Sequence, residues 1–240
     1  MDNDWLAINV HPSWSSFLDA DRLAQLASIR HQLGDGYDPA PDRVLRFLRL
    51  DLQRLRVVIL GQDPYPEPGV ATGRAFEVGG LHSWLTPFAQ TSLRNILRLL
   101  YRTDRQIEHY DQIPSFVAIR EQIARGEWKL LPPDRLFADW EEQGVLLLNT
   151  CLTVKGEPLL HRAIWLNFMQ DLLQYISTAE GDLAWFLWGK PAQAMMPWIE
   201  LGTIYPSRHP MMCSAKYADD FLKSDCFRET ADRVNWLGLK

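Results

Sequence analysis

The sequence is poor in cysteine, in net positive charge and in long apolar runs, and each shortage excludes a class of protein. Its three cysteines, Cys151, Cys213 and Cys226, are too few and too widely spaced for a disulfide scaffold or a zinc site. No apolar run approaches the roughly 18 residues of a membrane span. The first residues carry no basic region ahead of an apolar one, as a secretory signal would. We therefore expect a cytoplasmic protein with reduced thiols and no membrane segment.

Positive charge is scarce because 25 lysines and arginines face 30 aspartates and glutamates, which gives a net charge of −5. This balance argues against nucleic-acid binding through bulk electrostatics, although a local basic patch can still bind a polyanion. The sequence also lacks a glycine-rich loop of the Walker or dinucleotide-binding type, and it lacks metal-ligand spacing. We predict neither a metal nor another cofactor.

What the chain does have is enough apolar sequence for one sizeable core, because 47% of its 240 residues are hydrophobic. Apolar runs without alternation, typical of strands buried on both faces, occur at 57–60, 144–149 and 183–188, and residues 203–208 are interpreted as a short fourth strand or its end. Helical patterns occupy 20–33, 90–97 and 164–176, and residues 217–240 are expected to end the chain with a helix that contains Phe227, Ala231 and Val234. We predict an α/β protein, a three-layer α/β/α single domain over residues 1–240 with a central, mostly parallel four-stranded twisted sheet flanked by helices.

Polar residues follow the ends of these strands, where ligands bind in open α/β sheets. Asp63 and Tyr65 lie in a proline-stiffened loop after the first strand, Asn149 ends the second, and His209 follows the fourth. Each residue alone has an ordinary interpretation, such as a solvated acid in a turn or an amide that satisfies backbone groups. Together, an acid, an amide, a histidine and an aromatic ring fit the recognition and cleavage of a heterocycle.

Three segments at these positions resemble family 1 uracil-DNA glycosylases. They are GQDPY at 61–65 with Ala75-Phe76 after it, LLNT at 147–150, and HPMMCS at 209–214, where the family has HPSPLS. The resemblance implies a metal-independent glycosylase that flips uracil out of DNA and hydrolyses its N-glycosidic bond, leaving an abasic site in base excision repair. It further implies uracil-containing DNA as partner, a monomeric enzyme, and a proteinaceous inhibitor that mimics DNA.

The resemblance also implies a catalytic pair. Ionised Asp63 would stabilise the sugar cation and position the attacking water, assisted by the backbone N–H groups of Gln62 and Asp63. Neutral His209 would donate a hydrogen bond to the uracil oxygen that gains charge. Pro66 stands where the family has a histidine, beside the water site, so we expect lower activity without loss of function.

The uracil pocket implied by the resemblance consists of three further side chains. Asn149 would read the edge of the base, because cytosine presents the opposite donor and acceptor there. Phe76 would stack on the base, and Tyr65 would exclude the methyl group of thymine. A nearby histidine, His161, is interpreted as structural.

The expected DNA contacts depart further from the family pattern. Ser92 fits either a phosphate contact or an ordinary helix cap. Cys213 has the register of the family's wedge leucine, but the longer Met212 beside it can take over that role; adjacent methionines are otherwise typical of core filling. The complete set of expected DNA-binding residues is Ser92, Gly189, Lys190, Met212, Cys213 and Ser214.

Residues 98–143 are predicted to contain an insertion relative to the family, which would be either a loop that contacts DNA or a partner, or tolerated surface. Two other functions stay open at this stage. The altered wedge would also suit a glycosylase for another modified pyrimidine. The acidic net charge would suit a non-catalytic DNA- or protein-binding module on the same fold.

Overall fold

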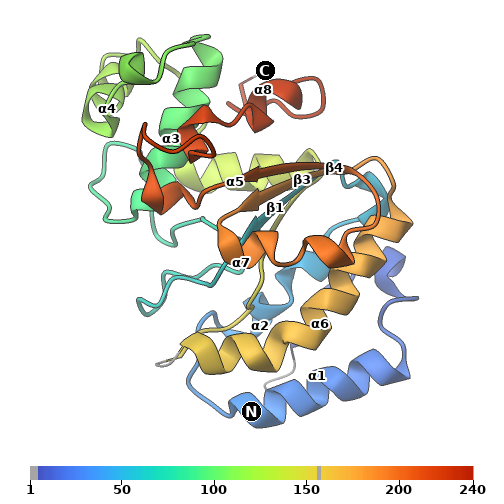
Figure 1. Cartoon of the computed structure of the whole chain (residues 1–240). Coiled ribbons are helices and arrows are strands. Elements are labelled where there is room, and N and C mark those ends of the chain that lie inside the picture. Colours follow the sequence, from blue (N-terminus) through green and yellow to red (C-terminus); the bar gives the residue numbers. More distant parts are fainter. Residues whose placement is uncertain (1–4, 156–157, 240) are drawn as a thin grey trace.

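The computed structural model describes residues 5–155 and 158–239, and it is built around a sheet of four parallel strands (Figure 1). The strand order is β2-β1-β3-β4, and every pairing is parallel, so the predicted α/β fold is confirmed. The strands are β1 (Val57–Gly61), β2 (Val145–Asn149), β3 (Ala184–Trp188) and β4 (Thr203–Ser207).

The register of the sheet brings the carboxyl ends of the strands to one edge. Gly61 at the end of β1 lies opposite Asn149 at the end of β2. Trp188 at the end of β3 lies opposite Ser207 at the end of β4. The loops that leave these four ends therefore start side by side. The polar residues that follow the strands in the sequence can thus lie close together at this edge of the sheet.

The core lies on both faces of the sheet, as the unbroken aliphatic sequence of β1 predicts. Val58 and Leu60 belong to one buried apolar cluster, whereas Val57 and Ile59 belong to a second cluster on the opposite face. This division follows from the two-residue side-chain period of a strand. All four side chains are fully buried.

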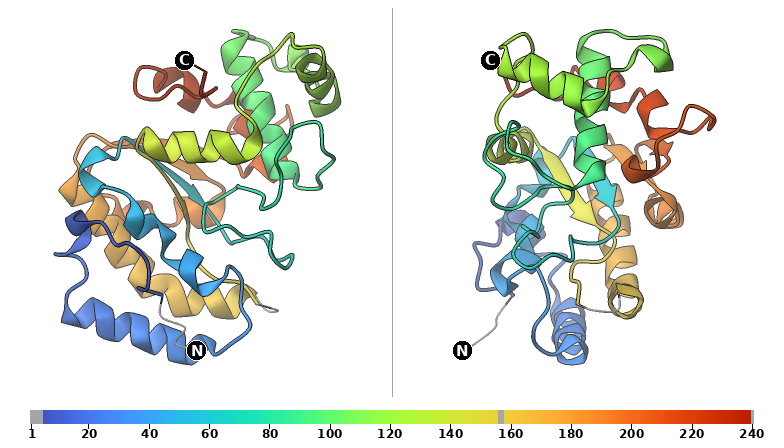
Figure 2. Two further views of the ribbon diagram at one scale, coloured as in Figure 1. Left: turned by 180° about the vertical axis from the view of Figure 1, so that it is seen from behind. Right: turned by 90° about the vertical axis from the view of Figure 1, so that its left-hand side faces the viewer.

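Helices cover the two faces in separate layers, as the views in Figures 1 and 2 show. One layer contains α1 (Ala20–Leu33) and α6 (Pro158–Ala179), and the other contains α3 (Thr91–Asp104) and α5 (Pro133–Glu142). No helix within the described residues is long and apolar enough to cross a membrane. The other short elements before the sheet are η1 (Pro12–Trp14), α2 (Pro41–Val44), η2 (Arg46–Arg49) and η3 (Leu52–Arg54).

The prediction for α1 matches the structure at both ends. The side chain of Asp19 accepts a hydrogen bond from the backbone N–H of Arg22 and so caps the start of the helix. Gly34 ends it with a φ of 62°, which glycine adopts without steric cost. Leu26, on the expected apolar face, is buried, but Leu23 on the same face is 41% exposed.

Residues 98–143 form a folded layer beside the sheet. After α3 come η4 (Tyr110–Gln112) and α4 (Phe116–Ala124), and α5 leads into β2. The layer has its own buried side chains, among them Ile119 and Trp128, and the indole Nε1 of Trp128 donates to Asp104 Oδ2 at 3.0 Å. This segment therefore contributes to the core on one face of the sheet.

The helix expected to contain Phe227, Ala231 and Val234 is shorter than predicted. Among the described residues after 216, only η7 (Phe221–Lys223) and α8 (Cys226–Glu229) form, and α8 includes Phe227 but neither of the other two residues. The hydroxyl of Thr230 donates to the carbonyl of Cys226 at 2.7 Å and accepts from the indole of Trp236 at 3.1 Å. These contacts turn the chain back after one helical turn, so packing overrides the local pattern. The last residue of the predicted range, 240, lies outside the described residues.

Candidate active site

The loops that follow β1 and β2 are joined by backbone hydrogen bonds. The N–H of Thr150 donates to the carbonyl of Gly61 at 3.1 Å, and the N–H of Cys151 donates to the carbonyl of Gln62 at 3.1 Å. The hydroxyl of Thr150 adds a second bond to the Gln62 carbonyl at 2.9 Å. The start of the Asp63 loop is therefore held in place by the segment that carries Asn149.

Four side chains expected in the base pocket line one small cavity: Asp63, Tyr65, Phe76 and Asn149. Its volume is about 20 Å³, the space of about one water molecule. The hydroxyl of Tyr65 is buried and has no hydrogen-bond partner among the described residues, and burial raises the pKa of Tyr65 above its ordinary value.

Gly61 permits the close packing of two of these side chains. A Cβ atom at this position would lie 2.5 Å from Asn149 Oδ1 and 3.1 Å from the ring of Phe76. Phe76 itself has a φ of 66°, a backbone conformation that is uncommon for a bulky residue. The sequence marks Gly61 as the end of a strand and the start of the GQDPY segment, and its packing role follows from a contact with β2.

Replacing Gly61 with alanine is expected to lower activity on uracil DNA at least tenfold, because the methyl group displaces Asn149 and Phe76 together. Single-turnover cleavage of a uracil oligonucleotide measures this. Gly181→Ala is the matched control, since its added Cβ would meet only a side-chain atom of Leu201 at an ordinary 3.5 Å. Equal rates for the two variants would contradict the packing role of Gly61.

His209 lies beside Phe76, with 6.0 Å between the ring centroids. Its Nδ1 accepts a hydrogen bond from the N–H of Met211 at 3.2 Å, so a neutral ring carries its proton on Nε2. Burial lowers the pKa of His209, against a smaller opposite effect from Asp63. A Cβ on Gly189, whose φ is 96°, would lie 2.9 Å from His209 Cβ, so Gly189 allows the histidine loop to approach β3.

Asp63 has a partner that the sequence did not indicate. Arg162, near the start of α6, donates from Nε to Asp63 Oδ1 at 2.7 Å and from Nη2 to Asp63 Oδ2. Gln62 Nε2 also donates to Asp63 Oδ2, at 2.8 Å. Arg162 is separated from Asp63 by 99 positions in the chain, and no local pattern marks a helical arginine as part of a site.

A second cluster missed by the sequence holds the segment that leads to Phe76. Arg74 forms ion pairs with Glu77 at 2.8 Å and with Glu141 of α5, and all three side chains are largely buried. Arg46 pairs with the same Glu141 carboxylate at 3.4 Å. Because a buried charge needs its partners, this cluster fixes the segment on α5.

Ser92 is not the ordinary N-terminal cap of its helix. The cap position of α3 is Gln90, which makes no side-chain capping bond, and Ser92 is a buried residue of the first turn. Three residues further along α3, Asn95 donates from Nδ2 to the carbonyl of Pro210 at 2.6 Å. The first turns of α3 therefore adjoin η6 (Pro210–Met212) of the histidine loop.

The two candidates for the wedge differ in exposure. Met211 and Met212 are 58% and 56% exposed, so the methionine pair does not fill the core. Cys213 is partly buried against the core, and its thiol donates to the Pro210 carbonyl at 3.3 Å. Burial raises the pKa of Cys213 to about 12, so the group is a neutral thiol at physiological pH.

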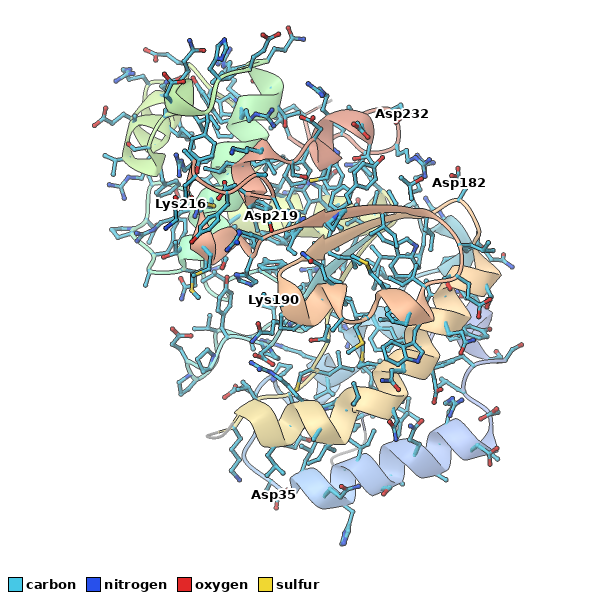
Figure 3. All side chains as sticks on the ribbon, viewed as in Figure 1. Asp35, Asp182, Lys190, Lys216, Asp219 and Asp232 are labelled. Carbon is cyan, nitrogen blue, oxygen red and sulfur yellow. The ribbon has the colours of Figure 1, made fainter. Side chains whose placement is uncertain are left out.

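The other expected DNA contacts lie around the same strand ends. Gly189 and Lys190 begin α7 (Lys190–Gln193) after β3, and Lys190 is exposed there (Figure 3). The backbone N–H of Ser214 donates to Asp220 at 2.5 Å, which orders the loop after η6. The same loop carries the exposed Lys216, also marked in Figure 3. The remaining short element is η5 (Met196–Trp198).

His161, interpreted as structural, lies in α6 and is buried. Its Nδ1 is 2.9 Å from the hydroxyl of Thr153, which also accepts from the indole of Trp165 at 2.8 Å. Burial lowers the pKa of His161. These contacts join α6 to the segment after β2.

Comparison with known proteins points to one family. The model of the Uracil DNA glycosylase superfamily matches residues 49–234. A uracil-DNA glycosylase of Mycolicibacterium vanbaalenii is 32% identical over 238 residues, which cover 96% of this chain and 93% of the relative. A uracil-DNA glycosylase of Tropheryma whipplei is 30% identical over 238 residues, which cover 95% of this chain and 91% of the relative.

Solved structures share the fold. The crystal structure of UNG from Nitratifractor salsuginis has a TM-score of 0.71 and 24% identity, covering 93% of this chain and 91% of that one. Mimivirus uracil-DNA glycosylase has a TM-score of 0.65 and 24% identity, covering 93% and 82%. A mimivirus UNG variant in complex with UGI has a TM-score of 0.59 and 23% identity, covering 83% and 70%.

Proposed function

Since the chain belongs to the uracil DNA glycosylase superfamily and is a hydrolase that excises uracil from DNA in base excision repair, we propose that Asp63 and His209 are its catalytic residues. The observation that carries this proposal is their placement. Asp63 lines the cavity with Asn149 and Phe76, and His209 lies against the ring of Phe76. An acid and a hydrogen-bond donor thus flank one small pocket.

Cleavage of the N-glycosidic bond creates positive charge on the sugar and negative charge on the departing uracil. Ionised Asp63 stabilises the sugar cation and orients the attacking water, with help from the backbone N–H groups of Gln62 and Asp63. His209 donates from Nε2 to the uracil oxygen that gains charge. The bond from the N–H of Met211 to Nδ1 favours this tautomer, because that nitrogen is used as an acceptor.

The remaining pocket residues select the base. Asn149 offers one donor and one acceptor to the edge of uracil, and cytosine would leave these groups unpaired. Phe76 stacks on the ring, and its own position is fixed against Trp188, with 5.2 Å between the ring centroids. Tyr65 stands against the position of the thymine methyl group. Burial of its hydroxyl supports a fixed, space-filling role.

We propose that DNA lies across the loops at the strand ends. Met212, rather than Cys213, is the wedge that fills the gap left by the flipped base, because Met212 is exposed and the thiol of Cys213 is packed inward. Phosphates bind at the start of α3 and at the turn after β3. The residues assigned to phosphate contact are Ser92, Gly189, Lys190 and Ser214.

The pH dependence of cleavage follows from His209, whose pKa burial lowers below its ordinary value near 6.5. Single-turnover rates are expected to stay level from about pH 8 down to about 6.5 and to fall only below that range. Protonation then places a hydrogen on Nδ1, where the N–H of Met211 donates, and tilts the ring. A decline that begins above pH 7 would contradict a depressed pKa.

The direct test of the function is cleavage by the purified wild-type protein. Single- and double-stranded oligonucleotides that contain one uracil are expected to release free base and to become alkali-labile at that position. Matched oligonucleotides with thymine or cytosine are expected to stay intact. A panel of modified pyrimidines identifies any preference for another base, and binding of uracil DNA without base release would show a non-catalytic module.

Several finer properties belong to the same proposal. Residues 1–240 would form one glycosylase domain, with an insertion in 98–143, although residues 1–4, 156–157 and 240 lie outside the described residues. The protein would act in the cytoplasm as a monomer. It would also bind a protein inhibitor that mimics DNA; UGI is seen in complex with a mimivirus UNG variant of the same fold.

A further inference from the structure

Both oxygens of the Asp63 carboxylate are engaged in the DNA-free protein. Arg162 donates hydrogen bonds to both of its oxygens, and Gln62 donates a further hydrogen bond to Oδ2. A carboxylate has about four acceptor positions, so little capacity is left for an attacking water. The side chain of Asp63 is 15% exposed, so the ion pair is only weakly screened by solvent.

This arrangement opposes the reaction that the site performs. A guanidinium whose Nε lies 2.7 Å from the carboxylate cancels much of the negative potential that Asp63 offers to a sugar cation. The positive charge of Arg162 would also repel that cation directly. The interaction with Asp63 raises the pKa of Arg162, so the side chain stays charged and cannot be neutralised in place.

Arg162 can leave without disturbing the core. Its side chain is 31% exposed, and it lies near the start of α6, on the side of the strand ends. The phosphates of a nucleotide are bonded to the same sugar that must face Asp63, so a bound substrate brings an anion within reach of this guanidinium. A phosphate can accept a bidentate pair of hydrogen bonds from a guanidinium, as a carboxylate does.

We propose that Arg162 is a positioning residue that masks Asp63 in the free protein and moves to a DNA phosphate beside the flipped nucleotide, freeing the carboxylate for the sugar. This inference rests on the proposed role of Asp63. The proposal makes cleavage depend on DNA binding, because only a phosphate in the correct place draws Arg162 away from Asp63. It also supplies a cation from α6 for the phosphate beside the flipped nucleotide.

Binding to DNA with an uncleavable fluorinated deoxyuridine tests the transfer. For Arg162→Gln, the slope of log K against log salt concentration is expected to be less negative by about 0.9, the value for one phosphate contact, and Arg162→Lys is expected to restore it. Arg22→Gln is the matched control, because Arg22 is 30% exposed and pairs with Asp171 at 3.0 Å. An unchanged slope for Arg162→Gln would overturn the transfer.

Cleavage of neutralised DNA tests the masking. Methylphosphonate can replace the phosphate on either side of uracil. At one of these two positions, it is expected to slow single-turnover cleavage by the wild-type protein about tenfold. Cleavage by Arg162→Gln is expected to lose this sensitivity. Equal sensitivity in both proteins, or loss of cleavage in Arg162→Gln on native DNA, would show that Arg162 stays on Asp63. Failure of the wild-type protein to cleave native uracil DNA would instead refute the role of Asp63, while the binding slopes still report on Arg162.

Discussion

Asp63→Asn is expected to slow single-turnover cleavage of uracil DNA by about a thousandfold or more, equivalent to about 4 kcal/mol of transition-state stabilisation. The amide keeps the size of the carboxylate, but it has one acceptor oxygen in place of two, so it loses part of the hydrogen bonding to Arg162 and Gln62. It also cannot offset a positive charge on the sugar. The rate should be measured at saturating enzyme, so that weaker DNA binding does not contribute.

The control for this variant must remove a carboxylate from an ion pair outside the site. Asp171→Asn does so on the same helix as Arg162, because Asp171 pairs with Arg22 at 3.0 Å. The control is expected to unfold within a few degrees of the wild-type protein, since a partly exposed ion pair contributes little to stability. Cleavage by Asp63→Asn at the rate of Asp171→Asn would show that Asp63 is not catalytic.

The sheet could be predicted because its strands are marked by local sequence. Unbroken aliphatic runs such as 57–60 have a single stable environment, between two apolar layers, and the helical patterns between them require parallel connections. The convergence of Asp63 and Asn149 followed from the same reasoning, since parallel strands end at one edge. The structure adds the register, in which Gly61 lies opposite Asn149.

The parts that could not be predicted depend on contacts between distant segments. Arg162 reaches Asp63 from a helix that begins far along the chain, and Arg74 finds Glu141 on α5. Neither pair has a spacing that a local pattern can show. The length of the C-terminal helix could not be predicted for a related reason, because the indole of Trp236 donates to the hydroxyl of Thr230 and Trp236 is buried among aromatic side chains.

His209→Ala is expected to lower the cleavage rate by about a hundredfold to a thousandfold, the usual cost of losing one donor to a developing oxyanion. Alanine also removes the acceptor for the N–H of Met211, so part of the loss could come from a loosened η6. Asparagine at the same position separates the two effects. Its short side chain can accept from that N–H as a helix cap does, but it cannot extend a donor to where Nε2 stands.

The two variants therefore give different outcomes for the two roles of His209. If the donor matters, His209→Asn is expected to be as slow as His209→Ala while it regains thermal stability, and both variants are expected to lose the acid limb of the wild-type pH profile. If His209 only caps η6, asparagine restores cleavage together with stability. Because Phe76 packs between the imidazole and Trp188, uracil affinity in both variants also reports whether the base pocket stays intact.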